Sequence, residues 1–444
     1  MRIRNKPYNP ARYLIGGFMA VILAGSLLLT LPAATRGDGI GYLDALFTAT
    51  SAVCVTGLVV VDTGTFFSPL GQAVIMILIF IGSLGFMTMA TLIFIFLGRR
   101  ISLRDRLVVK EALNQETMTN LVPLVTAVVR MAVILELAGA AVMSIRFVPE
   151  LGWGRGIFYG LFHAVSAFGN AGFDLFGNFD SLTRFPTDYL VNGMILALLI
   201  IGGLGFTVIF DLFKCVRHRC RPSLHTRMAV MITLILLLLG TAAVLALESK
   251  NPETMGALSP GGKLFAALFT AATPRTAGFS VLGTGAHYMP TLVIIMALMF
   301  IGASPASTGG GVKTTTFGAV VIALVALIRG QEEPVLFRRR LPLYQIFKAV
   351  AIIGGAITLV FFATFLLTMF ERQSFIALLF ETVSAFGTVG LSLGITPELS
   401  APGKAVLIFT MFSGRLGPLT MLVALARRKK EEGLNYPEEK LLIG

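Results

Sequence analysis

A short motif occurs four times along the chain, and it is the feature that most limits how the chain can fold. Each copy begins with Leu-Phe and reaches a glycine 11, 11, 10 and 11 residues later. A motif repeated at such even spacing indicates four copies of one structural unit. The copies read LFTATSAVCVTGL at 46–58, LFHAVSAFGNAGF at 161–173, LFTAATPRTAGF at 268–279 and LFETVSAFGTVGL at 379–391.

Each copy predicts a short helix followed by bare backbone. About ten apolar residues form such a helix but do not cross a bilayer, because a span needs roughly 20 residues. The small, glycine-bearing ending suits backbone with a positive φ angle. Inside a membrane this is a re-entrant loop, which survives only where it lines a wet cavity or is buried in protein. The alternative is a set of buried turns between membrane helices.

Four re-entrant loops around one axis would direct backbone carbonyl oxygens at a cation. Four copies favour this interpretation over buried turns, and we therefore predict a selectivity filter for K⁺. The predicted filter residues are Val55, Thr56, Gly57, Asn170, Ala171, Gly172, Thr276, Ala277, Gly278, Thr388, Val389 and Gly390.

Composition agrees with a membrane protein. Hydrophobic residues make up 55% of the 444 residues and charged residues 13%, against about 25% charged in soluble domains. The net charge of +13 is interpreted as a bias between the two sides of a membrane rather than as nucleic-acid binding. The first apolar stretch is too long for a cleavable signal, so it is predicted to be a true span.

The apolar stretches predict an all-α integral membrane protein with eight spans. Four helix–pore loop–helix repeats would surround one pseudo-fourfold pore. The predicted divisions are a cytoplasmic N-terminus at 1–12, repeat 1 at 13–97, a cytoplasmic loop at 98–122, repeat 2 at 123–213, a cytoplasmic loop at 214–227, repeat 3 with a broken last helix at 228–328, a cytoplasmic loop at 329–348, repeat 4 at 349–426 and a cytoplasmic tail at 427–444.

The distribution of Lys and Arg predicts the orientation. Of 36 such residues, 24 fall in the termini and the loops between repeats, and 8 fall in loops beside the short helices. Positively charged segments stay in the cytoplasm, so both termini are predicted there and the filter on the outer side. The remaining four lie at membrane depth: Arg130, Arg275, Lys313 and Arg415.

A charge at membrane depth is costly and usually functional. Arg415, near the middle of the last span, is predicted to bond filter-loop carbonyls or to repel cations in the pore. Arg275 is predicted to bond neighbouring loop backbone, and Lys313 to hold a gate through carbonyls or an acid. Arg130 lies near a span end, where its side chain can reach the interface.

A second repeated sequence pattern lies in the second helix of each repeat. It reads IGSLGF at 81–86, IGGLGF at 201–206, IGASPASTGGGVK at 301–313 and SGRLGP at 413–418. Glycines in the first two copies indicate close helix packing. The third copy would break the helix in mid-membrane and is predicted to be a gate. The predicted gate residues are Gly302, Ser304, Pro305, Ser307, Thr308, Gly309, Gly310, Gly311 and Lys313.

No catalytic constellation is present in the sequence. There is no nucleophile–base pattern, no cluster of metal ligands and no phosphate-binding loop, so the chain is predicted not to be an enzyme. Glu136 and Glu381 are single acids at membrane depth that could each pair with a basic residue. The three cysteines, Cys54, Cys215 and Cys220, give neither a disulfide framework nor a metal-binding spacing.

The whole chain resembles the bacterial Trk/Ktr/HKT superfamily of potassium transporters, most closely the Ktr membrane subunits. The resemblance rests on SAVCVTGL, FGNAGF, TPRTAGF and SAFGTVGL in the filter, on ASPASTGGGVKTTTF in the broken helix and on the arginine of SGRLGPLT. Eight spans with a short N-terminus are typical of Ktr subunits, whereas Trk relatives usually carry extra N-terminal helices.

The resemblance implies potassium uptake across the bacterial plasma membrane. It assigns selectivity to Gly57, Gly172, Gly278 and Gly390, gating to residues 302–316, and the pore arginine to Arg415. It also implies a homodimer on a cytoplasmic ring of KtrA-type regulatory subunits. ATP and ADP would act only through that ring, K⁺ would be the substrate, and Na⁺ often stimulates Ktr uptake. No covalently bound cofactor is expected.

Three alternatives compete with this interpretation. Some plant relatives carry serine at the first filter glycine and favour sodium, but Gly57 favours potassium here, so a sodium-translocating or weakly selective transporter of the same fold is the runner-up. A secondary transporter with inverted repeats would carry broken helices in paired halves, whereas this repeat is fourfold. A membrane enzyme would need clustered His, Asp or Glu at membrane depth.

Overall fold

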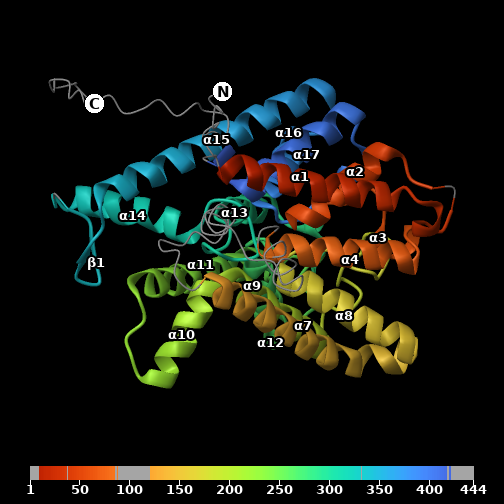
Figure 1. Cartoon of the computed structure of the whole chain (residues 1–444), viewed down its shortest axis with the longest axis horizontal. Helices are drawn as coiled ribbons and strands as arrows, with labels where there is room; N and C mark the ends of the chain where they lie inside the picture. Colours follow the sequence, from red (N-terminus) through yellow and green to blue (C-terminus); the bar gives the residue numbers. More distant parts are fainter. Residues whose placement is uncertain are drawn as a thin grey trace, which may run out of the picture.

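The computed structural model describes residues 10–37, 39–85, 88, 121–331, 333–417 and 420–421 (Figure 1). Within these ranges the regular secondary structure is helical apart from one two-stranded hairpin and two isolated β-bridges, and loops join the helices. The α-helices are α1 (Pro10–Leu29), α2 (Tyr42–Cys54), α3 (Thr63–Phe66), α4 (Pro69–Leu84), α7 (Leu121–Leu151), α8 (Trp153–Gly169), α9 (Tyr189–Leu204), α10 (Phe206–His218), α11 (Leu224–Glu248), α12 (Pro260–Ala272), α13 (Met289–Phe300), α14 (Thr314–Ile328), α15 (Leu343–Phe370), α16 (Phe375–Gly387) and α17 (Ala401–Leu416). The 3-10 helices are η1 (Pro32–Ala34), η2 (Thr284–Ala286) and η3 (Thr396–Glu398), and β1 (Val335–Leu336) pairs antiparallel with β2 (Arg339–Arg340).

The helices follow the predicted order of long helix, short helix and second helix. Among the described residues, four helices are long and apolar enough to cross a membrane, and they lie in α1, α7, α11 and α15. A fifth candidate is the bent pair of α9 and α10. The other predicted spans correspond to α4, α17 and the broken pair of α13 and α14, which are shorter. Eight spans therefore remain a prediction.

The second helices break more often than the sequence analysis predicts. The span predicted at 189–213 is bent by 95° between α9 and α10, because Gly205 between them has φ +93°. Helices α4 and α17 also end one residue before a glycine with positive φ, Gly85 (+82°) and Gly417 (+85°). A residue in the left-handed region ends an α-helix. The predicted parts at 89–120 and 422–444 lie outside the described residues.

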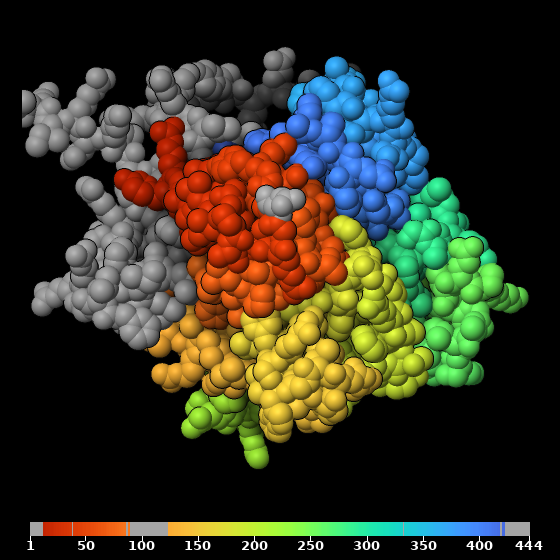
Figure 2. Space-filling view, turned by 90° about the vertical axis from the view of Figure 1, so that its right-hand side faces the viewer, coloured from red at the N-terminus to blue at the C-terminus, as the bar shows by residue number. Residues whose placement is uncertain are grey.

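Contacts between repeats close a ring. The second helix of each repeat packs against the short helix of the next: α4 against α8, α9 against α12, α13 against α16 and α17 against α2. Figure 2 shows the sequence colours following one another around the visible face, with the red first repeat next to the blue last repeat. This closure is cyclic rather than paired, as expected for a fourfold repeat.

The second residue of each motif forms the core of its repeat. Phe47, Phe162, Phe269 and Phe380 are each 0% exposed.

The short helices begin where the local sequence favours a helix N-terminus. In α12 and α16 the side chains of Ser259 and Ser374 accept hydrogen bonds from the amide three residues later, which satisfies a free amide of the first turn.

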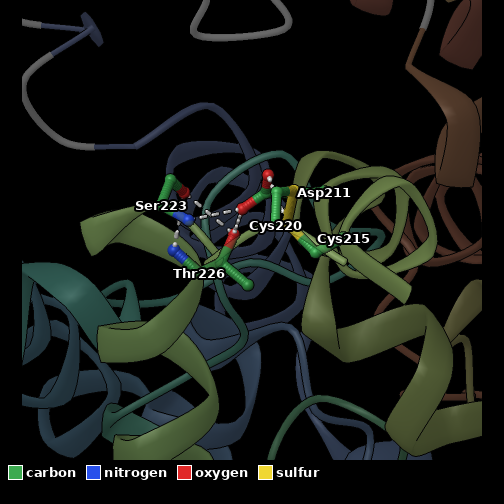
Figure 3. The surroundings of a disulfide bond; sticks show 5 residues. All are labelled: Asp211, Cys215, Cys220, Ser223 and Thr226. Atoms are coloured by element: carbon green, nitrogen blue, oxygen red, sulfur yellow. Dashed lines mark hydrogen bonds between the residues drawn. A yellow bond between two sulfur atoms is a disulfide. The ribbon is translucent and has the colours of Figure 1, made fainter. Parts of the chain in front are cut away.

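The corner between α10 and α11 carries a disulfide that the cysteine pattern does not predict. Cys215 and Cys220 are bonded, with their Cα atoms 4.5 Å apart (Figure 3). The left-handed conformation of Arg219 (φ +51°) turns the chain back so that the Cys220 amide donates to the Cys215 carbonyl. Such a short-range bridge depends on this local turn and not on the number of cysteines. Cys54 is free and buried.

The ion pair that joins the last repeat to the first is predicted to stabilise the ring. Lys404 Nζ in α17 lies 2.6 Å from Asp44 Oδ1 in α2, and the two side chains are 14% and 30% exposed. Asp44→Asn is expected to lower the free energy of unfolding by about 1–2 kcal/mol, because it leaves a partly buried ammonium unpaired. The double variant Asp44→Asn/Lys404→Met is then expected to be about 1 kcal/mol more stable than the sum of the two single effects would give.

The measurement is denaturant unfolding in mild detergent, analysed as a double-mutant cycle. The exposed Arg184–Asp180 pair within one loop is the control cycle, with an expected coupling below about 0.5 kcal/mol. Additive effects at Lys404 and Asp44 would contradict a closing role for this pair.

Candidate functional site

Three of the four short helices end in a left-handed residue, which turns the chain into the predicted filter. Val55 (φ +58°), Asn170 (+59°) and Thr388 (+52°) cap α2, α8 and α16. In the third copy the helix cap is Thr273, and the left-handed residue is Thr276 (+82°). The third copy contains a proline and is one residue shorter, which accounts for its different exit from the helix.

The four predicted filter glycines lie together in a ring. All four have positive φ, at +92° for Gly57, +68° for Gly172, +75° for Gly278 and +92° for Gly390. A Cβ atom on any of them would lie 3.0 Å or less from a carbonyl oxygen of the next repeat. These oxygens belong, in the same order, to Ala171, Ala277, Val389 and Thr56. Only glycine satisfies both the backbone angle and this close approach.

A hydroxyl in each short helix holds the following loop, and the sequence analysis missed these residues. The sixth residue of every motif is Ser or Thr: Ser51, Ser166, Thr273 and Ser384. Its carbonyl accepts from the amide of the middle filter residue in all four copies, at 2.7–2.9 Å. The signal was present in the sequence, since all four copies carry a hydroxyl at this position.

The hydroxyls act in two ways. Ser51 and Ser384 accept from the glycine amides of Gly57 and Gly390, at 3.0 and 3.1 Å. Ser166 and Thr273 instead donate to the carbonyls just after the glycine, at 2.7 and 2.6 Å. The four repeats therefore share the backbone hydrogen bond. Their side-chain hydrogen bonds are of one kind in repeats 1 and 4 and of another kind in repeats 2 and 3.

The predicted gate loop lies between α13 and α14. Helix α14 begins at Thr314, so the loop is shorter than the segment 302–316 that the resemblance implies. The loop is bonded to the end of α9: Ser304 N–H donates to Gly203 O at 3.0 Å, and Phe206 N–H donates to Ala306 O at 2.9 Å. Gly302, Ser304, Pro305, Thr308, Gly309, Gly310 and Gly311 are buried, and Ser307 and Lys313 are half-buried.

The gate loop contacts three of the four filter loops through their left-handed residues. The Asn170 side chain lies 3.1 Å from Thr308 Oγ1. Gly310 N–H donates to Thr388 Oγ1 at 2.9 Å. The Thr276 hydroxyl lies so close to Gly309 that a Cβ there would meet it. The fourth left-handed residue, Val55, has no polar side-chain atom to offer.

Arg415 contacts the gate loop and the first repeat. Its guanidinium donates to Thr308 O and to Gly82 O, and more weakly to Ser83 O at 3.4 Å. Of the two roles predicted for Arg415, bonding to filter-loop carbonyls is not what the structure shows, because its partners are the gate loop and the end of α4. Repulsion of cations in the pore stays a prediction. Lys313 Nζ donates to Gly309 O at 2.5 Å, which is the predicted carbonyl contact.

Two other charged residues have partners that differ from the predictions. Arg275 is buried, and its guanidinium donates to the Thr233 hydroxyl of α11 at 3.1 Å, not to loop backbone. The Glu381 carboxylate accepts from Ser392, Leu393 and Thr396 after the fourth filter loop, rather than pairing with a basic residue.

The arrangement presents neutral oxygens to a ligand. Within the described ranges no group of three or more His, Cys, Asp or Glu residues could hold a metal ion. Carbonyl oxygens in a ring suit a desolvated monovalent cation.

The profile of the TrkH family, described as "cation transport protein", matches residues 14–434. The chain belongs to the TrkH family of cation transport proteins. Its family members are transporters rather than enzymes, in agreement with the absence of a catalytic constellation from the sequence.

Individual relatives match over nearly the whole length. The chain is 45% identical to the Ktr system potassium uptake protein B of Bacillus subtilis, covering 98% of this chain and 97% of that protein. It is 44% identical to the protein of the same name from Vibrio alginolyticus, covering 98% and 94%. The crystal structure of the potassium transporter TrkH from Vibrio parahaemolyticus matches with a TM-score of 0.75 at 20% identity, covering 96% of this chain and 86% of that chain. That structure shows that the two chains share a fold.

Loss of the Ser384 hydroxyl is expected to destabilise the fourth filter loop. Ser384→Ala leaves the half-buried Gly390 amide without this partner, which should cost about 1 kcal/mol in the free energy of unfolding. The control is Thr382→Val on the same helix, whose hydroxyl only bonds back to Leu378 O. Unfolding in detergent measures both variants, and equal stability would mean that the hydroxyl does not hold the loop.

Proposed function

We propose that this family member takes up potassium through the ring formed by the four filter loops. The observation that carries the proposal is the cyclic approach of each filter glycine to a carbonyl of the next repeat. Left-handed residues on both sides of Thr56, Ala171, Ala277 and Val389 allow successive carbonyls to face one axis. There they would replace the water shell of K⁺.

The membrane potential would drive the flux inward. It is worth about 2.3 kcal/mol per elementary charge per 100 mV, so no chemical reaction in this chain is required. The gate loop would block the inner half of the pore, and its contacts with Asn170, Thr276 and Thr388 would couple it to the filter. Opening would have to break these contacts and to release Thr308 O from Arg415.

Relatives support potassium as the cargo. Two full-length relatives above 40% identity are named potassium uptake proteins. A third, at 39% identity over 100% of this chain and 99% of its own length, is the potassium/sodium uptake protein NtpJ of Enterococcus hirae. Sodium transport is therefore the second candidate, and glycine at all four filter positions favours potassium.

The remaining features of the proposal concern the assembly. The protein would lie in the plasma membrane with both termini in the cytoplasm, as a homodimer with one pore per subunit. A cytoplasmic ring of KtrA-type subunits would bind ATP or ADP and bias the gate, since a partner shifts such an equilibrium only by preferring one state. Sodium would act as an activator.

A serine at a filter glycine is predicted to impair selectivity. At Gly390 a Cβ would collide with Thr56 O and with Gly57, and φ is +92°. Gly394→Ser is a matched control, because Gly394 has φ +91° but nothing within 4 Å of a Cβ. Potassium uptake is measured in cells stripped of their own uptake systems, at low external potassium.

We expect wild type and Gly394→Ser to restore growth, and Gly390→Ser to raise the half-saturating potassium concentration or to admit sodium. The filter proposal fails if Gly390→Ser is expressed and transports like Gly394→Ser. Sodium uptake by wild type in preference to potassium would favour the second candidate.

Loss of one gate contact is predicted to raise flux through this subunit when it is reconstituted without a cytoplasmic partner. Thr308→Val removes the pairing with Asn170, which should cost the closed state about 1 kcal/mol and raise the open population about fivefold. Rubidium-tracer uptake into proteoliposomes measures this, with Thr358→Val on the exposed face of α15 as the control. Unchanged or lower flux in Thr308→Val would show that this contact does not hold the gate closed.

A further inference from the structure

The corner between α10 and α11 is tied by a covalent bond and a carboxylate that the proposed function does not use. Cys215, in the last turn of α10, is bonded to Cys220, five residues later. Asp211 Oδ2 accepts from Ser223 N–H at 2.9 Å and from the Thr226 hydroxyl at 2.5 Å, at the start of α11. Figure 3 shows the disulfide and the Asp211 network next to each other.

The two cysteines differ in access and surroundings. Cys220 is exposed, whereas Cys215 is 7% exposed. Arg219 and Arg221 flank Cys220 in the sequence, and positive charge nearby favours a reactive thiolate. Cys215 Sγ instead lies 4.0 Å from Asp211 Oδ1, whose negative charge disfavours a thiolate. Cys220 is therefore the attacking sulfur and Cys215 the resolving one.

Helix α10 connects this corner directly to the gate loop. At its first residue, Phe206 N–H donates to Ala306 O at 2.9 Å. At the preceding residue, Gly205 lies against Pro305 O so closely that a Cβ would collide with it. The 13-residue helix is thus held at one end by the gate loop and at the other by the disulfide. In Figure 1 it projects from the body of the molecule beside α11.

We propose that Cys215 and Cys220 form a reversible thiol–disulfide site, whose oxidised form fixes α10 and thereby holds the gate loop closed. The distribution of Lys and Arg predicts that this corner lies in the cytoplasm. Disulfides there are rare and are usually transient, catalytic or redox-sensing. The redox site stands on the geometry of the corner, and its control of flux rests on the proposed function.

The oxidant is a low-molecular-weight disulfide such as oxidised glutathione. Cys220 loses its proton, and its thiolate attacks one sulfur of oxidised glutathione, forms a mixed disulfide and releases one glutathione thiolate, which takes up a proton to become a thiol. Cys215 then loses its proton, attacks the Cys220 sulfur and expels the second glutathione as a thiol. The protein gives up two electrons and two protons, which appear in two glutathione thiols, and reduction by glutathione reverses both steps.

The first experiment titrates the thiols of the full-length protein in glutathione redox buffers. The redox reaction is stopped with acid, and the protein is then unfolded and alkylated with a maleimide, so that buried Cys215 and Cys54 are counted along with Cys220 by intact mass. We expect wild type to pass from three alkylated thiols to one in a single transition. Cys220→Ser should keep two alkylated thiols throughout. Three alkylated thiols in wild type in every buffer would overturn the proposal.

The second experiment compares oxidised and reduced protein in proteoliposomes. In the oxidised form we expect amide exchange across 205–210 to be at least about tenfold slower and rubidium uptake at least about fivefold lower. For Cys220→Ser, amide exchange and rubidium uptake should be the same in the oxidising and the reducing buffer. A thiol transition without a change in exchange or uptake overturns control of the gate. Responsive exchange with no uptake in either state supports the redox site and contradicts the proposed function.

Discussion

Close contact of backbone with backbone at four glycines is the constraint on which the rest of the structure depends. Each filter glycine leaves no room for a Cβ beside a carbonyl of the next repeat, so the four loops can approach only if each exposes bare backbone. Bare backbone at membrane depth carries polar groups that must be satisfied or must face a wet cavity. The short helices meet this need by supplying a carbonyl and a hydroxyl from Ser51, Ser166, Thr273 and Ser384.

The same close packing recurs just before the filter loops, where the second helices meet the C-terminal ends of the short helices. A Cβ on Gly82, Gly202 or Gly414 would collide with the carbonyl of the penultimate residue of α2, α8 or α16. In the third repeat the equivalent Gly302 packs against Gly310 O of the gate loop instead. One repeat has thus replaced a contact between helices by a contact with a loop. That exchange places the predicted gate loop against the left-handed residues Asn170 and Thr388 of the predicted filter loops.

The four repeats differ where they contact the predicted gate loop. Asn170, Thr276 and Thr388 face the loop with polar side chains, whereas the equivalent Val55 cannot. Arg415 supplies the missing link, since it bonds both Thr308 O and the end of α4 in the first repeat. A guanidinium has several donors in a fixed plane, which explains how one side chain can join two distant carbonyls.

The sequence by itself determined the repeat, the order of helices, the four glycines and the break in the second helix of the third repeat. It predicted a short helix in each copy of the motif, because a local motif of apolar and small residues specifies such a helix and the turn after it. Only the tertiary structure decided the partners of Arg415, Arg275 and Glu381, the bend at Gly205 and the Cys215–Cys220 bridge. The sequence spacing of the three charged residues does not record which distant carbonyl or hydroxyl lies within reach, and the disulfide depends on the left-handed turn at Arg219. Periodicity reports local backbone preference, whereas these contacts join segments up to 333 residues apart.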